Sequence, residues 1–206
     1  MNNKAFYDIT SGLYLVTAES EAKKSGCIIN TFTQVSSNPK SIIISINKEN
    51  YTTDLIKQKM SFHVSVLSKN TTMDFIRVFG FASGRDVSKF AGIEFDVDAN
   101  KNPIIKEFSV ADFTCEVKSI QDVKTHLLVI AEVIDASKNS DDEVLTYSYY
   151  QKYLKGSTPK NAVSYQEEKA GYTCEICGYT YEGEELPENF VCPVCGAPIT
   201  MMKKNN

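Results

Sequence analysis

The sequence lacks the features of several protein classes. No stretch approaches the roughly 18 consecutive apolar residues of a membrane-spanning helix, and residues 1–4 lead into mixed sequence without the apolar region of a signal peptide. Lys and Arg form no cluster and the net charge is −4, whereas a phosphate-backbone partner requires a concentrated basic face. We therefore expect a cytoplasmic protein that binds neither membrane nor nucleic acid.

The common nucleotide-binding glycine motifs are absent as well. Residues 1–165 contain neither G-x-G-x-x-G nor G-x-x-x-x-G-K-[ST], so a nucleotide cofactor there would have to be held in another way. What the chain has is an ordinary globular composition, 42% hydrophobic and 23% charged over 206 residues. That length suits one domain of usual size and a small appendage.

Turn-rich and polar segments divide the chain into two expected units. Residues 155–160 are rich in turn formers and residues 166–171 are polar, so we expect a domain at 1–165, a linker at 166–171 and a second domain at 172–206. A unit of fewer than roughly 40 residues rarely folds unaided, so a bound metal must supply much of its stability. The second unit is also the acidic one.

The first 150 residues are mainly β by pattern, because runs rich in Ile, Val, Phe and Tyr are separated by polar turns. Residues 62–66 alternate apolar with polar, which is typical of a sheet with one wet face and places His63 toward solvent or a dimer surface. The lack of regular β-α-β alternation favours a Greek-key or split β-barrel with a few short helices. We expect strands near residues 12–18, 27–33, 41–47, 62–67, 111–120, 126–134 and 146–149, and helices at 52–60, 72–79 and 86–91, the first capped by Thr52 or Thr53 and the second by Thr71 or Thr72.

Six cysteines should remain reduced in the cytoplasm, and four of them form two C-x-x-C-G motifs. Two such knuckles can place four thiolates tetrahedrally around one ion, and the glycine after each supplies a positive φ that turns a backbone N–H toward a sulfur. Iron and zinc both accept this ligand set. The predicted metal ligands are Cys174, Cys177, Cys192 and Cys195, and Cys27 and Cys115 are expected to be buried thiols.

Aromatic residues surround these cysteines, at Tyr172, Tyr179, Tyr181 and Phe190. At these residues the second unit resembles rubredoxin, in which a Y-x-C-x-x-C-G-Y-x-Y start and an aromatic-V-C-P-x-C-G finish build a small aromatic core over an iron. Its short segment between the knuckles is similar to the compact rubredoxin-like domain of rubrerythrins. The resemblance implies an iron held by four cysteines, with zinc as a substitute. The alternative is a structural zinc ribbon without a redox role, which the same spacing would satisfy.

Polar residues at 30–36 and 45–48 lead up to the helix start at residues 51–53. A helix N-terminus offers unpaired N–H groups and a positive dipole end, and Thr hydroxyls add donors, which suits a phosphorylated cofactor. The alternative is that Thr52 or Thr53 is only a helix cap and residues 47–50 only a solvated turn.

Short motifs at residues 12–17, 30–36, 62–67, 86–90 and 125–133 occur in the order seen in the flavin reductase-like, FMN-binding split-barrel family, which the first unit resembles. The resemblance implies bound FMN that NAD(P)H reduces. His126 would then be the catalytic contact to the flavin or the hydride donor, and otherwise an ordinary polar residue at a sheet rim. The resemblance implies that Asn30, Thr31 and Thr33 face the isoalloxazine ring, that Ser45, Asn47 and Thr52 hold the ribityl phosphate, and that Lys89 and His126 close the site.

As a whole the chain resembles the high-molecular-weight rubredoxins of anaerobic bacteria, in which an NAD(P)H:FMN oxidoreductase domain feeds an attached rubredoxin. A flavin takes two electrons as hydride and can release them singly, whereas a four-thiolate iron takes one. The resemblance implies a homodimer that passes electrons from NAD(P)H through FMN to iron and on to an acceptor such as a flavodiiron protein. Two alternatives are a free-flavin reductase that supplies reduced FMN, and a flavin- or haem-binding protein with a structural zinc ribbon.

Overall fold

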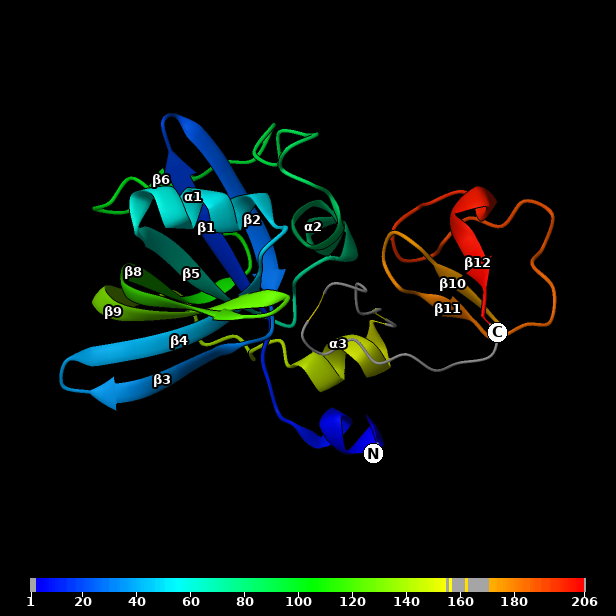
Figure 1. The fold of residues 1–206 in the computed structure, drawn as a ribbon, viewed down its shortest axis with the longest axis horizontal. Helices are drawn as coiled ribbons and strands as arrows, with labels where there is room; N and C mark the ends of the chain where they lie inside the picture. The colour runs from blue at the N-terminus through cyan, green and yellow to red at the C-terminus, as the bar shows by residue number, and fades with distance from the viewer. Residues whose placement is uncertain (1–2, 155, 157–161, 163–170, 206) are drawn as a thin grey trace.

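The structure is a computed structural model that describes residues 3–154, 156, 162 and 171–205. A β-rich body is followed by a small second part, which the chain forms after residue 171 (Figure 1). A 3-10 helix, η1 (Asn3–Asp8), precedes the body. Except for Gly171, the linker expected at 166–171 lies outside the described residues.

Seven antiparallel strands form the sheet of the body, in the order β2-β1-β5-β8-β9-β4-β3. Cys27 of β2 and Ile44 of β4 belong to the same buried cluster although their strands lie near opposite edges of the sheet. The sheet therefore curls around one core, which agrees with the predicted mainly β barrel. The strands are β1 (Tyr14–Ser20), β2 (Lys23–Ile29), β3 (Phe32–Ser37), β4 (Lys40–Asn47), β5 (Ser61–Leu67), β8 (Ser109–Val123) and β9 (His126–Lys138), and a separate hairpin consists of β6 (Asp96–Val97) and β7 (Pro103–Ile104).

Helix α1 (Tyr51–Lys59) packs across β1 and β2, where Leu55 and Ile56 enter the barrel core (Figure 1). The helix was expected, but its predicted cap is wrong. The residue that precedes the helix is Asn50, while Thr52 and Thr53 lie within the first turn, each only 1% exposed. Their hydroxyls bond to neighbouring strands and turns, so the threonines connect the helix to the sheet.

Helix α2 (Met73–Ile76) begins where the side chain of Thr72 accepts a hydrogen bond from the Phe75 N–H, which confirms one of the two predicted caps. The chain then widens into a π-helical turn, η2 (Arg77–Phe81), instead of continuing as an α-helix to residue 79. Phe75 and Phe79 pack with their rings 4.9 Å apart. They belong to a second apolar core that lies outside the barrel.

Three predictions of secondary structure are wrong. The strand expected at 27–33 is two strands, because the chain leaves β2 after Ile29 and enters β3, at the opposite edge of the sheet, with Phe32. The strand expected at 146–149 is helix α3 (Tyr147–Tyr153), which starts because Thr146 accepts a hydrogen bond from the Tyr149 N–H. The helix expected at 86–91 is a series of turns.

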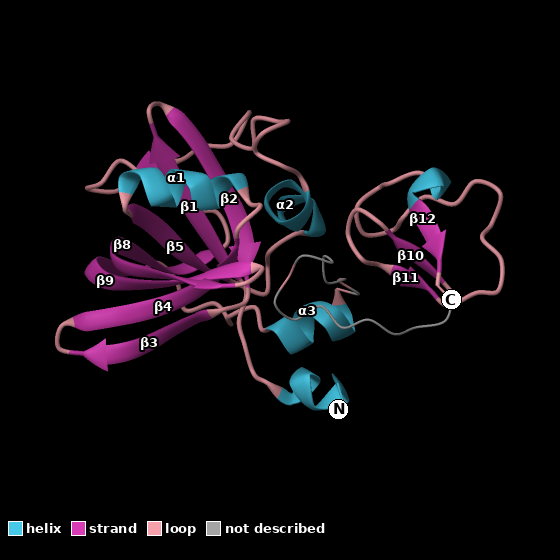
Figure 2. Cartoon of the chain, viewed as in Figure 1, coloured by secondary structure: helices cyan, strands magenta, loops and turns pink. Residues whose placement is uncertain are grey.

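The small second part is a three-stranded sheet in the order β11-β10-β12 with a short 3-10 helix. Figure 2 shows that loops make up most of this part. Its buried cluster consists mainly of cysteines, so there is little apolar core to hold it together without a metal. The elements are β10 (Tyr172–Cys174), β11 (Thr180–Tyr181), η3 (Ile199–Met201) and β12 (Met202–Lys204).

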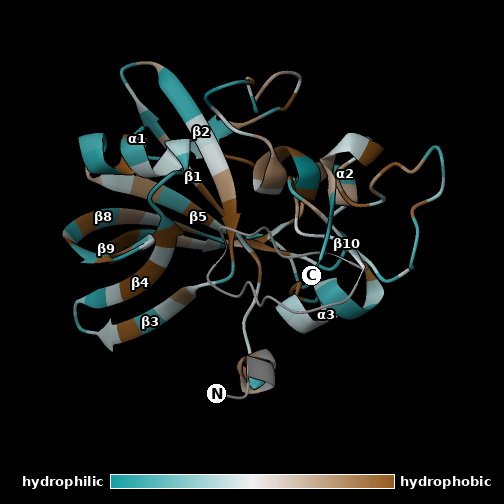
Figure 3. Ribbon diagram, turned by 45° about the vertical axis from the view of Figure 1, so that its right-hand side comes forward, coloured by the Kyte–Doolittle hydropathy of each residue, from teal (hydrophilic) through white to brown (hydrophobic). Residues whose placement is uncertain are grey.

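Hydrophobic residues gather near the middle of the barrel strands, and the hairpin ends are hydrophilic (Figure 3). Among the residues that the structure describes, no helix combines the length and the apolarity needed to cross a membrane.

Candidate functional site

The four predicted metal ligands come together in the small part. Their sulfur atoms all lie within 4.8 Å of one another. The Sγ atoms of Cys174 and Cys195 are 3.6 Å apart, and those of Cys177 and Cys192 are 3.5 Å apart. Metal–sulfur bonds of 2.3 Å in a tetrahedron give an edge of about 3.8 Å, so this arrangement fits one ion. Three of the cysteines are buried and Cys195 is half-buried.

The two knuckles have the same backbone geometry. Gly178 and Gly196 have φ values of 77° and 73°, and each donates its N–H to the carbonyl of the first cysteine of its knuckle at 2.9 Å. A Cβ on Gly196 would meet nothing within 4 Å. Glycine is therefore favoured there by the positive φ of the backbone and not by a lack of space. The predicted positive φ after each cysteine pair is confirmed.

Backbone N–H groups also stabilise the thiolate of Cys192. Its pKa falls to about 5 because of the neighbouring Cys177 thiol, while burial opposes this and the N–H groups of Cys195 and Val194 add to it. Burial raises the pKa of Cys195 to about 11, against the N–H of Ala197. Peptide N–H groups therefore face the sulfurs from the second knuckle, as a site for an anionic metal–thiolate centre requires.

Of the four aromatic residues that the sequence places around the cysteines, one packs against the cluster and two pack against each other. The rings of Tyr181 and Phe190 lie 5.2 Å apart, edge to face, and Tyr179 packs against the cysteine cluster. Met73 and Phe81 also pack against this cluster, although they belong to α2 and η2 of the body. The metal centre is thus in contact with the barrel unit, which the sequence did not predict.

At one end of the barrel, Asn47 is the last residue of β4 and pairs with His126, the first residue of β9. Both line an open cavity of about 360 Å³ with Lys48 and Thr125. His126 Nδ1 lies 2.9 Å from the Thr125 hydroxyl, and the Asn47 side chain accepts the Glu49 N–H at 2.7 Å. The structure therefore brings two of the predicted flavin residues together beside a cavity.

The three residues predicted to contact the ring lie at the start of β3 and just before it, and Ser45, predicted to hold the phosphate, lies on β4. Thr31 donates its hydroxyl to Asn30 Oδ1 at 3.3 Å, where the chain crosses from β2 to β3. Thr33 is exposed and pairs across the strands with Ile43, and Ser45 follows on the same face of β4. Thr33 and Ser45 thus share the sheet face on which Asn47 also lies, and Asn30 and Thr31 lie in the connection between β2 and β3.

Thr52 and Lys89 lie elsewhere, on the inner side of α1 and the following loops. Thr52 Oγ1 bonds Ser25 Oγ at 3.1 Å. The Lys89 ammonium donates to the carbonyls of Gly26 at 2.8 Å and Phe79 at 3.1 Å, and burial lowers its pKa. Both side chains bind the middle of β2, so the structure does not place them in the cavity beside His126.

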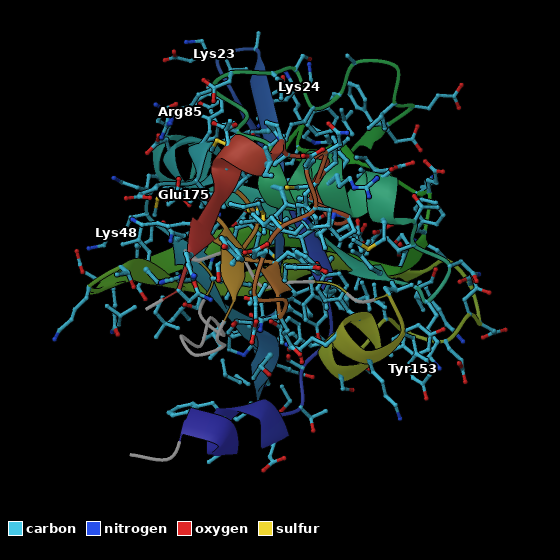
Figure 4. The ribbon with its side chains drawn as sticks, turned by 90° about the vertical axis from the view of Figure 1, so that its right-hand side faces the viewer. Lys23, Lys24, Lys48, Arg85, Tyr153 and Glu175 are labelled. Atoms are coloured by element: carbon cyan, nitrogen blue, oxygen red, sulfur yellow. The ribbon has the colours of Figure 1, made fainter. Side chains whose placement is uncertain are left out.

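Two further cavities, of about 480 and 490 Å³, open near the start of α1 and share Lys23, Tyr51 and Arg85. Arg85 lies over the Tyr51 ring at 5.0 Å and bonds Asp54 at 2.6 Å. Figure 4 shows Lys23 and Arg85 on the same side of the molecule.

His63 is 2% exposed, so its predicted place at solvent or a dimer surface is wrong. Residues 98–102 cover this face of β5, and the ring lies between Asp98 and Asp112, 3.4 Å from each carboxylate. Cys27 and Cys115 are buried as predicted.

The chain matches two family models, one for each unit. Residues 6–156 match the flavin reductase like domain, and residues 172–203 match the rubrerythrin, rubredoxin-like domain. A high molecular weight rubredoxin of Moorella thermoacetica is 34% identical over 96% of this chain and 96% of its own. A ferric-chelate reductase (NAD(P)H) of Archaeoglobus fulgidus is 41% identical over 82% of this chain and 100% of its own.

A solved structure agrees with the fold of the first unit. The NADH:FAD oxidoreductase of Streptomyces globisporus superposes with a TM-score of 0.63 at 24% identity, covering 69% of this chain and 84% of the other. The predicted barrel and the predicted resemblance to high-molecular-weight rubredoxins are therefore confirmed. The chain belongs to the flavin reductase-like domain family and carries, after that domain, a rubredoxin-like domain of the rubrerythrin type.

Proposed function

We propose that this protein takes electrons from NAD(P)H through bound FMN, passes them to an iron held by its four cysteines, and delivers them to an acceptor protein. Membership of the two families establishes the coarser statement, an oxidoreductase for flavin-dependent electron transfer with a rubredoxin-like domain. The observation that carries the finer proposal is the packing of the cysteine cluster against α2 and η2 of the flavin reductase-like unit.

The chemistry of the donor set fits iron. Four sulfurs at tetrahedral spacing, N–H groups facing them, and the Tyr179 ring packed against them suit a centre that alternates between two charge states. Such a centre supplies one-electron transfer when bound. The residues of the chain hold the ion, fix its geometry and limit its contact with water.

The polar residues at the end of the barrel fit a flavin. Asn30, Thr31 and Thr33 would face the ring system, Ser45 and Asn47 would hold the ribityl phosphate, and His126 would line the open cavity beside Asn47. A bound flavin supplies the step from a hydride donor to single electrons. These residues need no acid or base role in that chemistry, because their work is to bind and orient the flavin and the nicotinamide.

We propose that Thr52 and Lys89 support the flavin site indirectly, through contacts with β2. Lys89 bonds the Gly26 carbonyl and Thr52 bonds the Ser25 hydroxyl, both on β2, the strand that leads to Asn30. A direct contact between the Lys89 ammonium and a flavin phosphate would require its two carbonyl bonds to open. The two residues therefore support the site through the strand that carries Asn30.

The acceptor would dock on the acidic side of the rubredoxin-like unit. Glu184, Glu185 and Glu188 are exposed between the two knuckles, and this charge suits a partner with a basic patch that is steered electrostatically. A flavodiiron protein is the acceptor we propose. We also propose a homodimer, because the outer face of β4 and β9 carries Ile43, Leu128 and Ile130, which are half-buried in one copy.

The test is an anaerobic titration of the protein with NADH and with NADPH, followed by visible absorption, with metal and flavin analysis of the same sample. The proposal expects iron and flavin in equal amounts, and both become reduced by one of the two donors. Stoichiometric zinc without an iron band would support the structural zinc ribbon instead. Loosely held flavin, with turnover only on added FMN, would support a free-flavin reductase.

A further inference from the structure

Arg77 reaches from the barrel unit to the second cysteine knuckle. It is the first residue of η2, and its side chain makes two hydrogen bonds to the rubredoxin-like unit. Its Nη2 donates to the carbonyl of Pro193 at 2.8 Å, and its Nε donates to the carbonyl of Val194. Its Nη1 bonds Asp74 at 2.6 Å, one turn earlier. The guanidinium is thus held on one side by its own helix and on the other by the metal-binding loop.

The two acceptors are the residues between the metal ligands Cys192 and Cys195. A rigid guanidinium fork that bonds two successive carbonyls fixes both the distance and the orientation of the loop. Val194 is 3% exposed and belongs to the buried cysteine cluster. The hydrogen bonds of Arg77 therefore hold the loop that carries two of the four metal ligands.

Apolar contacts join the same two elements as this polar connection. Met73 and Phe81, at the two ends of the α2–η2 segment, pack both against the cysteine cluster and against the second core of the barrel unit. The apolar contacts and the Arg77 hydrogen bonds therefore join the α2–η2 segment to the same small unit. Buried apolar contacts with a more exposed polar side chain beside them are the pattern of a specific docking surface rather than of a chance contact.

We propose that Arg77 is a positioning residue that holds the rubredoxin-like unit on the α2–η2 segment, in the one orientation from which electrons pass between flavin and iron. This rests on the proposed function. With both cofactors bound, NAD(P)H would supply two electrons and one proton as hydride; each electron would convert one ferric ion to ferrous, and the proton would be released to water. One hydride therefore serves two iron reductions, and the acceptor must take one electron from iron between them.

The charge of Arg77 has a second effect on the same step. Reduction makes the iron–thiolate centre more negative, so a fixed cation next to the ligand loop favours the reduced form and raises the reduction potential. Position and charge can be separated by substitution. Arg77→Gln removes the charge and the fork, whereas Arg77→Lys keeps a positive charge but has no planar fork for two carbonyls.

The first experiment measures docking without any redox activity. In the full chain loaded with zinc, ¹⁵N relaxation reports how fast the residues around the cysteines tumble relative to the barrel strands. We expect one shared correlation time in the native protein and faster tumbling of residues 172–203 in Arg77→Gln. Lys138→Gln is the control, since Lys138 pairs only with Asp141 at the surface among the contacts described. Unchanged tumbling in Arg77→Gln would overturn the proposal.

The second experiment measures electron transfer in the iron-loaded protein after rapid anaerobic mixing with the nicotinamide donor. We expect flavin reduction at the native rate in Arg77→Gln and iron reduction slower by at least roughly tenfold, because misplaced partners lose rate steeply. The iron potential should fall in Arg77→Gln and stay near the native value in Arg77→Lys. If native iron is not reduced through the flavin at all, the proposed function fails, and the tumbling experiment still decides whether Arg77 docks the two units.

Discussion

Replacing His63 by leucine should destabilise the barrel strongly, because it leaves two buried carboxylates without their cation. The imidazole lies 3.4 Å from Asp98 on one side and 3.4 Å from Asp112 on the other. Burial lowers the pKa of His63, but the two carboxylates outweigh this and raise it above its usual value. Burial likewise raises the pKa of Asp98 and Asp112, yet His63 and other donors bring both below their usual value.

The size of the loss in stability depends on the hydrogen bonds that each carboxylate retains after His63 is replaced. Removing one partner of a buried ion pair costs about 3–5 kcal/mol. Asp98 keeps two backbone N–H bonds, from Asn100 and Asn102, and Asp112 keeps the Ser109 hydroxyl and the Asn139 amide. Because these hydrogen bonds remain, the loss of stability in His63→Leu should lie near the lower end of that range, at about 3 kcal/mol. For a chain of this length that corresponds to a fall in Tm of roughly 6–12 °C.

The pH dependence has a definite sign. A histidine whose pKa is raised on folding stabilises fully below its unfolded pKa, near 6.5, and this contribution disappears as the pH rises through the folded pKa. The two aspartates, with pKa values lowered on folding, stabilise above roughly pH 4 and lose this as the pH falls through their folded values. The difference in Tm between native protein and His63→Leu should be greatest between about pH 4 and 6.5.

Thermal unfolding followed by far-ultraviolet circular dichroism, at pH 5.5 and at pH 9, measures this difference. Lys138→Gln breaks an exposed ion pair and should change stability by less than about 0.5 kcal/mol. A variant that combines His63→Leu with Asp98→Asn and Asp112→Asn should recover part of the loss, because no buried charge is left unpaired. A loss below about 1 kcal/mol in His63→Leu, equal at both pH values, would refute the ion-pair reasoning.

Three further substitutions test the helix cap and the metal site. Thr146→Ala removes the acceptor for the Tyr149 N–H at the start of α3 and should cost about 1 kcal/mol, measured by urea unfolding; an unchanged midpoint would contradict the cap. Cys177→Ser should abolish the iron absorption band while the flavin is still reduced by the nicotinamide donor; retention of the band would show that Cys177 is not a ligand. Gly196→Ala forces a positive φ on alanine and should cost about 1 kcal/mol and speed metal loss to a chelator, although its Cβ has room; a native rate of loss would contradict the backbone argument.

Much of the fold was predictable because it depends on short-range pattern. The strand expected at residues 41–47, which contains the apolar run Ile42, Ile43 and Ile44, is β4, and it lies between β3 and β9. The spacing of the cysteines predicted their cluster, since each knuckle closes within five residues. The segment that starts at Thr146 was mispredicted because its tyrosines favour strands, whereas the Thr146 cap favours a helix and the packing of Tyr150 in the second core supports it.

What could not be predicted depends on residues far apart in the sequence. His63 lies on a polar position of an alternating strand, and only the covering loop around Asp98 makes that position buried. Arg77 is separated by 117 residues from Val194, and nothing in either local sequence indicates the contact. The positions of Thr52 and Lys89 also depend on distant residues, because their side chains bond Ser25 and Gly26 of β2.

Docking and metal binding must depend on each other in this protein. The rubredoxin-like unit has a buried cluster of three cysteines, Val194 and Ala197, and it completes this cluster with Met73 and Phe81 from the barrel unit. A unit with so little apolar surface of its own gains its fold from the metal, and only the folded knuckle presents the two carbonyls to Arg77. By linkage, anything that strengthens docking also tightens metal binding. Arg77→Gln should therefore speed the loss of zinc from the full chain to a chelator, even though Arg77 touches no sulfur in the described contacts.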